Sequence, residues 1–167
     1  LKASIEHPEV KILNCSIGRP YKTLRTYYGR LYEAKFLTGM IAGVMTKNDK
    51  IAYKAPMPNY GTVADINAFT LGARMTNPRA KVYLHWNSQA NAEPFRALLE
   101  REEISVVSDN NFITPSSENR DYGLYMIEGA FTKHLATPIN NWVRFYDRIV
   151  RDYLAGNWDT RNELGAE

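Results

Sequence analysis

The chain has 167 residues, of which 44% are hydrophobic and 23% charged, a composition typical of a folded domain with a buried core. Its formal net charge of +3 is too small to indicate a nucleic-acid-binding protein. Four basic residues do cluster before the first long helical pattern: Arg19, Lys22, Arg25 and Arg30. We interpret them as a solvated hinge segment rather than a phosphate-binding surface. The longest apolar run, FLTGMIAGVM, is shorter than the roughly 20 residues that a membrane span needs.

The cysteine and histidine content argues against metal and redox sites. Cys15 is the only cysteine, which excludes an internal disulfide and a multi-cysteine zinc site. It lies in an apolar strand pattern, so we expect a buried, inert thiol. The histidines, His7, His85 and His134, have no metal-like spacing. We therefore expect neither a metal nor a cofactor.

The first half of the chain alternates between strand and helix periods. A strand is predicted over 10–17 and a helix over 30–46, where Gly39 and Gly43 share a face and predict tight packing against a sheet. The apolar residues of that helix recur at three- and four-residue steps: Leu37, Met40, Ile41, Val44 and Met45. A strand over 50–55 precedes a helix with Thr62 as its N-cap, which ends at 76–78. Its predicted core face consists of Val63, Ile66, Phe69 and Ala73.

The second half continues in the same way. The patterns predict strands over 81–86, 104–108, 123–127 and 135–139, and helices over 92–102 and 142–155. The last helix ends at Gly156. This spacing favours right-handed crossovers, and therefore an α/β fold with a doubly wound, mainly parallel sheet.

Ligands of such sheets bind beyond the carboxyl ends of the strands. Four predicted loops follow strands at that edge, namely PMPNYGT, HWNSQAN, DNNF and EGAFTKH. Their candidate ligand-binding residues are Trp86, Asn87, Asp109, Tyr60, Glu128, Asn59 and Asn110, with Asn91 beside them. An aromatic ring among amides and carboxylates is suited to a flat small molecule with polar edges.

Each candidate also has a purely structural interpretation. Trp86 is equally typical of a core or rim aromatic, and Tyr60 of a ring packed over the loop prolines. Asp109 is suited to capping the turn that follows it. No Gly-rich phosphate loop, Gly-x-Ser-x-Gly elbow or recognisable triad is present, so the sequence favours a binding protein over an enzyme.

Three stretches together resemble one family, in order along the chain: YEAKFLTGMIAGVMTKNDKIAY, INAFTLGARMTNPRAKVYLHW and TPINNWVRFYDRIVRDYLAGNW. The family is the basic membrane protein (BMP) group, which includes purine nucleoside receptor lipoproteins and substrate-binding subunits of nucleoside ABC importers. The resemblance covers roughly residues 10–158. It implies a type I periplasmic-binding-protein fold, in which two α/β lobes joined by a hinge close on a nucleoside-like ligand.

The resemblance also implies a domain organisation. Family members carry a larger first-lobe segment before the strand that matches residues 10–17. We therefore expect residues 1–29 to be a remnant of the first lobe plus the hinge, and residues 30–167 to be the second, C-terminal ligand-binding lobe. The N-terminal lobe of the same polypeptide would be the missing partner. Without it, the exposed strand ends offer a surface through which two copies could form a homodimer.

The match departs from the nucleoside receptors at two points. They resemble a pair of aspartates after the strand at 123–127, where this chain has only Glu128. They often have lysine where this chain has Asn140, before the Asn-Trp pair. A carboxylate grip on ribose hydroxyls is therefore in question, and the ligand class stays open between nucleosides and other small polar molecules.

These features predict a solute-binding lobe that delivers a nucleoside-like ligand to an ABC permease, as an extracytoplasmic, membrane-anchored lipoprotein. The alternative is a metabolite-sensing regulatory domain of the same fold, cytoplasmic and fused to a signalling or DNA-binding partner. An enzyme acting on nucleosides would need a catalytic base from the missing lobe.

Overall fold

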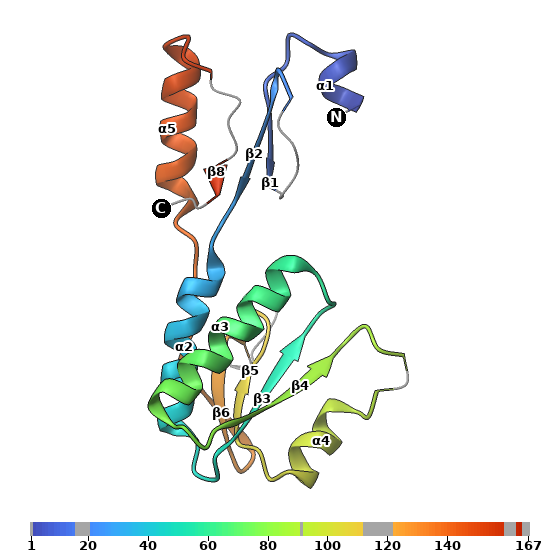
Figure 1. Cartoon of the computed structure of the whole chain (residues 1–167), viewed down its shortest axis with the longest axis vertical. Coiled ribbons are helices and arrows are strands. Elements are labelled where there is room, and N and C mark those ends of the chain that lie inside the picture. Colours follow the sequence, from blue (N-terminus) through green and yellow to red (C-terminus); the bar gives the residue numbers. More distant parts are fainter. Residues whose placement is uncertain (1, 16–20, 91, 112–121, 159–162, 165–167) are drawn as a thin grey trace. The chain divides into compact units, whose positions relative to one another are not determined.

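The computed structural model describes residues 2–15, 21–90, 92–111, 122–158 and 163–164. The chain forms two compact units, one made of Leu1–Arg30 with Asn140–Glu167 and the other of Leu31–Ile139. Each unit is described by itself below, with the elements labelled as in Figure 1.

The first unit contains a small parallel sheet of order β1-β2-β8 and two helices. Its elements are α1 (Lys2–Glu6), β1 (Ile12–Cys15), β2 (Leu24–Tyr28), α5 (Trp142–Leu154) and β8 (Glu163–Leu164). Phe145 and Ile149 of α5 pack against Tyr27 of β2 in a buried cluster. The Tyr27 hydroxyl also lies 2.6 Å from that of Tyr146. These contacts group α5 with the N-terminal segment, whereas the division expected at residues 29 and 30 assigned residues 140–167 to the other lobe.

Cys15 is exposed, which corrects the expectation of a buried thiol. The physical reason is its place at the end of β1, which is an edge strand of the small sheet. The first two residues of β1 are half-buried and the last two are exposed. The apolar strand pattern therefore indicates burial for only part of the strand.

The second unit is an α/β layer structure with a sheet of order β4-β3-β5-β6-β7. Its elements are α2 (Leu31–Met45), β3 (Lys50–Ala55), α3 (Tyr60–Thr76), β4 (Lys81–Trp86), α4 (Phe95–Arg101), β5 (Val106–Ser108), β6 (Leu124–Glu128) and β7 (Phe131–Ala136). Strands β4, β3 and β5 are parallel, whereas β6 and β7 form an antiparallel hairpin beside β5. The predicted α/β fold with a mainly parallel sheet is confirmed.

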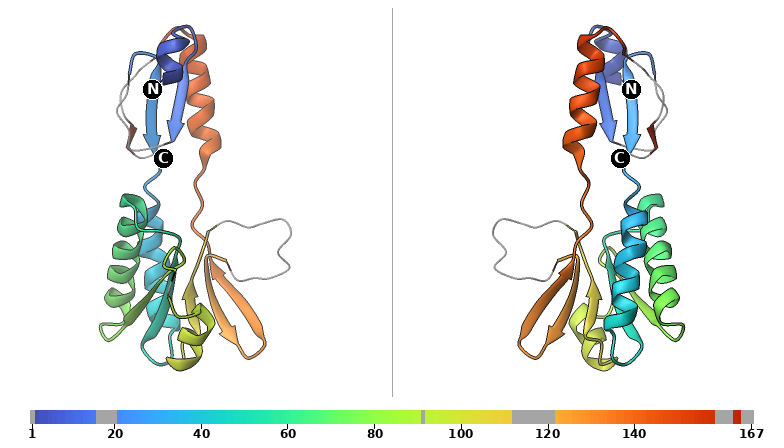
Figure 2. Two further views of the ribbon diagram at one scale, coloured as in Figure 1. Left: turned by 90° about the vertical axis from the view of Figure 1, so that its right-hand side faces the viewer. Right: turned by 90° about the vertical axis from the view of Figure 1, so that its left-hand side faces the viewer.

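Alternate strand residues face opposite layers of helices, as the two-residue period of a strand requires. Ile51 and Tyr53 of β3 belong to one cluster with Phe69 of α3. Ala52 lies on the other face, in a cluster that Phe95 of α4 packs against. Helices α2 and α3 lie side by side in both views of Figure 2, and α4 covers the opposite face.

Glycines bring α2 and α3 into very close contact. A Cβ atom added to Gly39 would lie 2.1 Å from the carbonyl oxygen of Phe69, and one added to Gly72 would lie 2.0 Å from that of Phe36. The shared face of Gly39 and Gly43 was expected to pack on a sheet. The close contact is confirmed, but the partner is a helix.

This helix pairing changes which side chains are buried. Leu37, Ile41 and Val44, which the helical period suggested as inward-facing, are exposed, and so is Val63 of α3. The buried side of α2 instead carries Lys35, Thr38, Gly39, Ala42 and Gly43. Small residues occupy it because backbones this close leave no room for large side chains.

Candidate functional site

The carboxyl ends of β4, β3 and β5 form one edge of the sheet. Ala55 pairs with Trp86 and Tyr53 with Ser108, so β3 and β4 end at the same level and β5 ends two residues earlier. We call this the strand-end edge and define it by the following residues: Asn59, Tyr60, Trp86, Asn87, Asp109, Asn110 and Asn111. The fold thus brings six of the seven predicted ligand-binding residues to one edge.

Trp86 is half-buried at the end of β4 and packs against the core cluster that lies under α2 and α3. The ladder continues past the strands, since the Asn87 amide donates to the Ala55 carbonyl (2.8 Å) and the Ser88 amide to the Pro56 carbonyl (3.1 Å). The indole is therefore held by its inner side while part of it remains exposed. This packing fits the interpretation of Trp86 as a rim aromatic, and its role as a ligand platform stays a prediction.

Asn59 and Tyr60 begin α3. The Asn59 side-chain oxygen accepts a hydrogen bond from the Thr62 amide at 2.9 Å, so Asn59 is the N-cap and the predicted cap at Thr62 is wrong by three residues. The period of the apolar residues did not extend to the first turn, which explains the error. Tyr60 is 73% exposed, so its ring does not pack closely over the loop prolines.

Asp109 is the most constrained residue of the edge. Lys54 of β3 donates to one carboxylate oxygen at 3.0 Å, and the Asn110 amide donates to the other at 2.7 Å. Backbone bonds between Asp109 and Gly123, and between Gly123 and Asn110, are each 2.7 Å long. Asp109 therefore caps the turn, as its structural interpretation suggested, while its side chain stays 11% exposed at the edge.

Lys35 is a part of the site that the sequence did not reveal. It lies on the buried side of α2 and is 2% exposed. Its ammonium group donates to the side-chain oxygen of Asn111 at 2.8 Å and to the hydroxyl of Ser108 at 3.3 Å. The nitrogen also lies 5.2 Å from the centre of the Tyr53 ring, within range of a cation–π interaction.

Burial sets the charge balance around Lys35. Desolvation lowers the pKa of Lys35 to about 8, opposed by the carboxylates of Asp65 and Asp109. Desolvation likewise raises the pKa of Asp65 to about 6, opposed by Lys35. A buried positive charge, bonded to two neutral acceptors and influenced by two nearby carboxylates, thus lies directly behind the loop that follows β5. The signal in the sequence was the spacing of this lysine, which places it on the same helical face as Thr38 and Ala42 rather than on the charged face of α2.

Glu128 does not belong to the strand-end edge, and its predicted place there is wrong. Strand β6 runs antiparallel to β5, with Ser108 opposite Leu124. The Ile127 amide bonds to the Ser105 carbonyl at 2.8 Å, next to the amino end of β5. Glu128 therefore lies at the opposite edge, exposed in the tight turn of the β6–β7 hairpin. Asn91 and residues 112–121 of the predicted loops lie outside the described residues.

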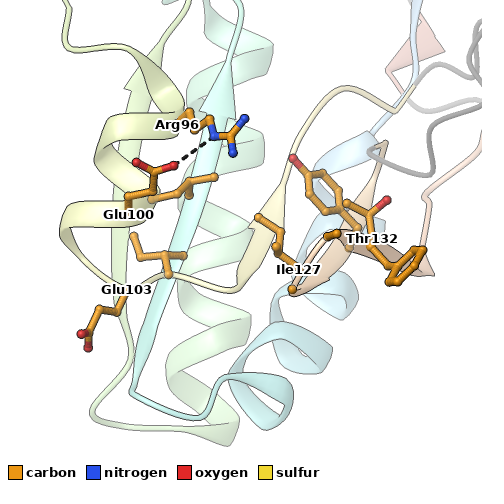
Figure 3. A pocket seen from close by; sticks show the side chains of 11 residues that line it. Arg96, Glu100, Glu103, Ile127 and Thr132 are labelled. Atoms are coloured by element: carbon orange, nitrogen blue, oxygen red, sulfur yellow. Dashed lines mark hydrogen bonds and ion pairs between the residues drawn. The ribbon is translucent and has the colours of Figure 1, made fainter.

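A separate cavity of about 430 Å³ lies at that opposite edge, between α4 and the hairpin (Figure 3). Figure 3 shows Arg96 and Glu100 of α4 on one side of it and Ile127 and Thr132 of the hairpin on the other. Its walls are mostly apolar, and its only ion pair, between Arg96 and Glu100 at 3.0 Å, links two exposed side chains of one helix. None of the strand-end residues lines it.

Within the described part of the chain, no group of three His, Cys, Asp or Glu side chains is arranged to hold a metal ion. No helix among the same residues is long and apolar enough to cross a membrane.

In α/β folds, ligands bind beyond the carboxyl ends of the parallel strands, and this is where the aromatic ring, the amides and the Lys54–Asp109 ion pair lie. A solved structure supports this fold. The ABC transporter solute-binding protein of Conexibacter woesei matches 98% of this chain and 60% of its own with a TM-score of 0.62, at 15% identity.

A sequence profile of the Bmp family, described as ABC transporter substrate-binding protein PnrA-like, matches residues 4–94. The match covers more than half of the chain, which therefore belongs to the Bmp family. The resemblance to the BMP group seen in the sequence is confirmed.

Two curated relatives carry different ligand names. A protein of Haloferax volcanii, named as an ABC transporter glucose-binding protein, is 25% identical over 92% of this chain and 42% of its own length. A purine-binding protein of Brucella abortus is 24% identical over 97% of this chain and 50% of its own length. The chain thus spans half or less of the length of these relatives.

Proposed function

We propose that this chain is the ligand-binding part of a solute-binding protein that delivers a small, flat, polar ring compound, a purine base or nucleoside, to an ABC permease. One observation carries the proposal: the ends of three parallel strands bring Trp86 and the amides to one edge, beside the buried Lys35 of α2. The family membership supports the class of protein, and the residues of the edge support the proposed ligand chemistry.

The half-buried indole of Trp86 supports a ring ligand. A planar base stacked on it would bury an aromatic face that is now partly in water, and stacking of this kind contributes about 1 kcal/mol beyond the area buried. The purine named for the Brucella relative is such a ring. The glucose named for the Haloferax relative is not aromatic, so a direct comparison of the two ligand classes decides between them.

The length of the two curated relatives fits this function. Because the curated relatives are about twice as long, we propose that a further lobe of the same polypeptide closes over the strand-end edge, rather than a second copy of this chain. The second unit, Leu31–Ile139, would be one ligand-binding lobe and the first unit part of the other. An extracytoplasmic, lipid-anchored position is the one in which such a protein meets its permease.

Two alternatives have less support. The relatives with the best coverage are named for ligand binding and transport, which favours uptake over metabolite sensing. The family is one of substrate-binding proteins, and we propose no reaction for this chain.

The test is calorimetric titration of the intact protein with hypoxanthine, adenine, adenosine and glucose, repeated with Trp86→Ala. A bound purine at about a hundred times its dissociation constant should also raise the free energy of unfolding by about 2.7 kcal/mol. We expect purine binding that Trp86→Ala weakens at least tenfold, the order of magnitude of a lost stacking contact with its buried area. Glu128→Gln, at the opposite edge, is the matched control and should bind as the wild type does. Binding of glucose alone would refute the proposed ligand class.

A further inference from the structure

Three side chains of the strand-end edge accept hydrogen bonds from donors of the protein itself. The Asn59 oxygen accepts from the Thr62 amide at 2.9 Å, and the Asn111 oxygen accepts from Lys35 at 2.8 Å. Both oxygens of Asp109 are also taken, one by Lys54 and the other by the Asn110 amide. Three residues from two loops thus use acceptor atoms for bonds within the protein.

Chemistry fixes the orientation of the two amides. A backbone N–H and an ammonium group can only donate, so the atom of Asn59 or Asn111 that faces them must be the oxygen. Each side-chain NH₂ group then points away from its internal partner. The buried ammonium of Lys35 makes this choice firm for Asn111, because a buried charge that faced an NH₂ group would lose a hydrogen bond and meet a like dipole.

Other groups near the edge do not reverse this bias. Asn87 is exposed and offers both donors and an acceptor, so it does not discriminate. The carboxylate of Asp65 belongs to the second turn of α3 and not to a strand-end loop. Its charge is balanced by Lys35.

We propose that the strand-end edge recognises its ligand by donating hydrogen bonds, through the NH₂ groups of Asn59 and Asn111, to acceptor atoms on the ring. The inference rests on the function proposed above and specifies its ligand class. A ring that presents a carbonyl oxygen fits this edge, whereas a ring that presents an amino group brings donor against donor. Among purines, the edge selects 6-oxo over 6-amino bases.

The structure offers matched variants that exchange donor for acceptor without removing the internal bonds. In Asn111→Asp, one oxygen still accepts from Lys35 and the second oxygen replaces the NH₂ group. In Asn59→Asp, one oxygen still accepts from the Thr62 amide, and aspartate caps a helix as well as asparagine does. Asn67→Asp, an exposed position on α3, makes the same change of charge away from the edge and is the control.

The experiment measures dissociation constants of hypoxanthine and adenine for the intact wild type and these variants by calorimetry. We expect the wild type to bind hypoxanthine at least about tenfold more tightly than adenine, the effect of leaving a donor unpaired. Asn111→Asp or Asn59→Asp should weaken hypoxanthine binding by about tenfold and shift the preference toward adenine, while Asn67→Asp should change neither.

The outcomes separate this inference from the function on which it rests. A wild type that binds purines but prefers adenine overturns the inference alone. The same holds if both edge variants keep the wild-type preference within twofold. A wild type that binds neither base refutes the purine ligand of the proposed function, and the inference falls with it.

Discussion

The buried ammonium of Lys35 should give the free energy of unfolding a distinctive dependence on pH. In the folded protein burial lowers the pKa of Lys35 to about 8, from its ordinary value of 10.5. Between these two values the unfolded chain holds a proton that the folded chain has released. Stability therefore rises with pH across this window, and below pH 8 the folded protein carries the full cost of the buried charge.

The magnitude follows from the size of the shift. Each pH unit of difference between the folded and unfolded pKa corresponds to about 1.4 kcal/mol, so the whole window corresponds to about 3 kcal/mol. Between pH 7 and pH 9.5 about 2 kcal/mol of this should be recovered. Lys35→Met has no group that titrates there, so the stability of the wild type should rise by this amount relative to the variant.

The assay is urea unfolding followed by circular dichroism at several pH values from 7 to 9.5, with the difference between wild type and variant plotted against pH. Taking the difference in the free energy of unfolding cancels the contribution that titration of the other lysines and the tyrosines makes to both proteins. Lys35→Gln is a second variant, which keeps hydrogen-bonding capacity toward Ser108 and Asn111, in case methionine prevents folding. Lys47→Met removes an exposed lysine just after α2 and is the control. A difference that stays flat or falls as the pH rises would show that Lys35 is not a buried charge.

Two further predictions concern the same pair of helices. Gly39→Ala should destabilise the second unit by about 3 kcal/mol or more, because its methyl group would lie 2.1 Å from a backbone oxygen of α3. Thermal unfolding measures this effect, with Leu37→Ala at an exposed position of α2 as the control. Asp65→Asn should become more stable relative to the wild type as the pH rises from about 4 to 6. The pKa of Asp65 is raised in the folded protein, so ionisation of this group over that range lowers the stability of the wild type. Denaturation curves that show an unchanged difference in stability across this pH range would contradict the prediction.

The regular part of the second unit could be predicted from the sequence because local periods determine it. The strand over 81–86 has the predicted ends, and so does the one over 50–55. Runs of β-branched and aromatic residues between turn signals define such strands without reference to the rest of the fold. The same alternation of periods predicted which strand ends meet, and six ligand-binding candidates followed from it.

The β6–β7 hairpin escaped prediction because its turn is very short. Glu128 pairs with Phe131, so only Gly129 and Ala130 form the loop, and Gly129 has a φ of 63° that a residue with a side chain rarely adopts. The segment EGAFTKH therefore resembles a polar strand-end loop although most of it is strand. Because this turn was not recognised in the sequence, the predicted direction of β6 was reversed and Glu128 was predicted at the wrong edge.

The burial of Lys35 could not be predicted from the sequence for a different reason. Its burial depends on how α2 packs against α3, and the glycine contacts that set this packing join residues about 30 positions apart. A helical period identifies an apolar stripe, but it does not say whether a partner helix approaches through that stripe or through the small residues beside it. Here the small residues made the contact, and the lysine in their phase was buried with them.

The position of Glu128 changes what this part of the chain can recognise. With that residue at the opposite edge, Asp109 is the one carboxylate among the described strand-end residues, and Lys54 and the Asn110 amide already occupy its oxygens. An ionised carboxylate only accepts hydrogen bonds and is suited to the hydroxyl donors of a sugar, so the described strand-end residues offer little for a ribose or a hexose beyond Asp109. The strand-end edge is left with an indole for stacking and amide donors for ring acceptors. If the proposed ligand is correct, this edge contacts its base, and we expect a free base to keep every contact that the edge provides.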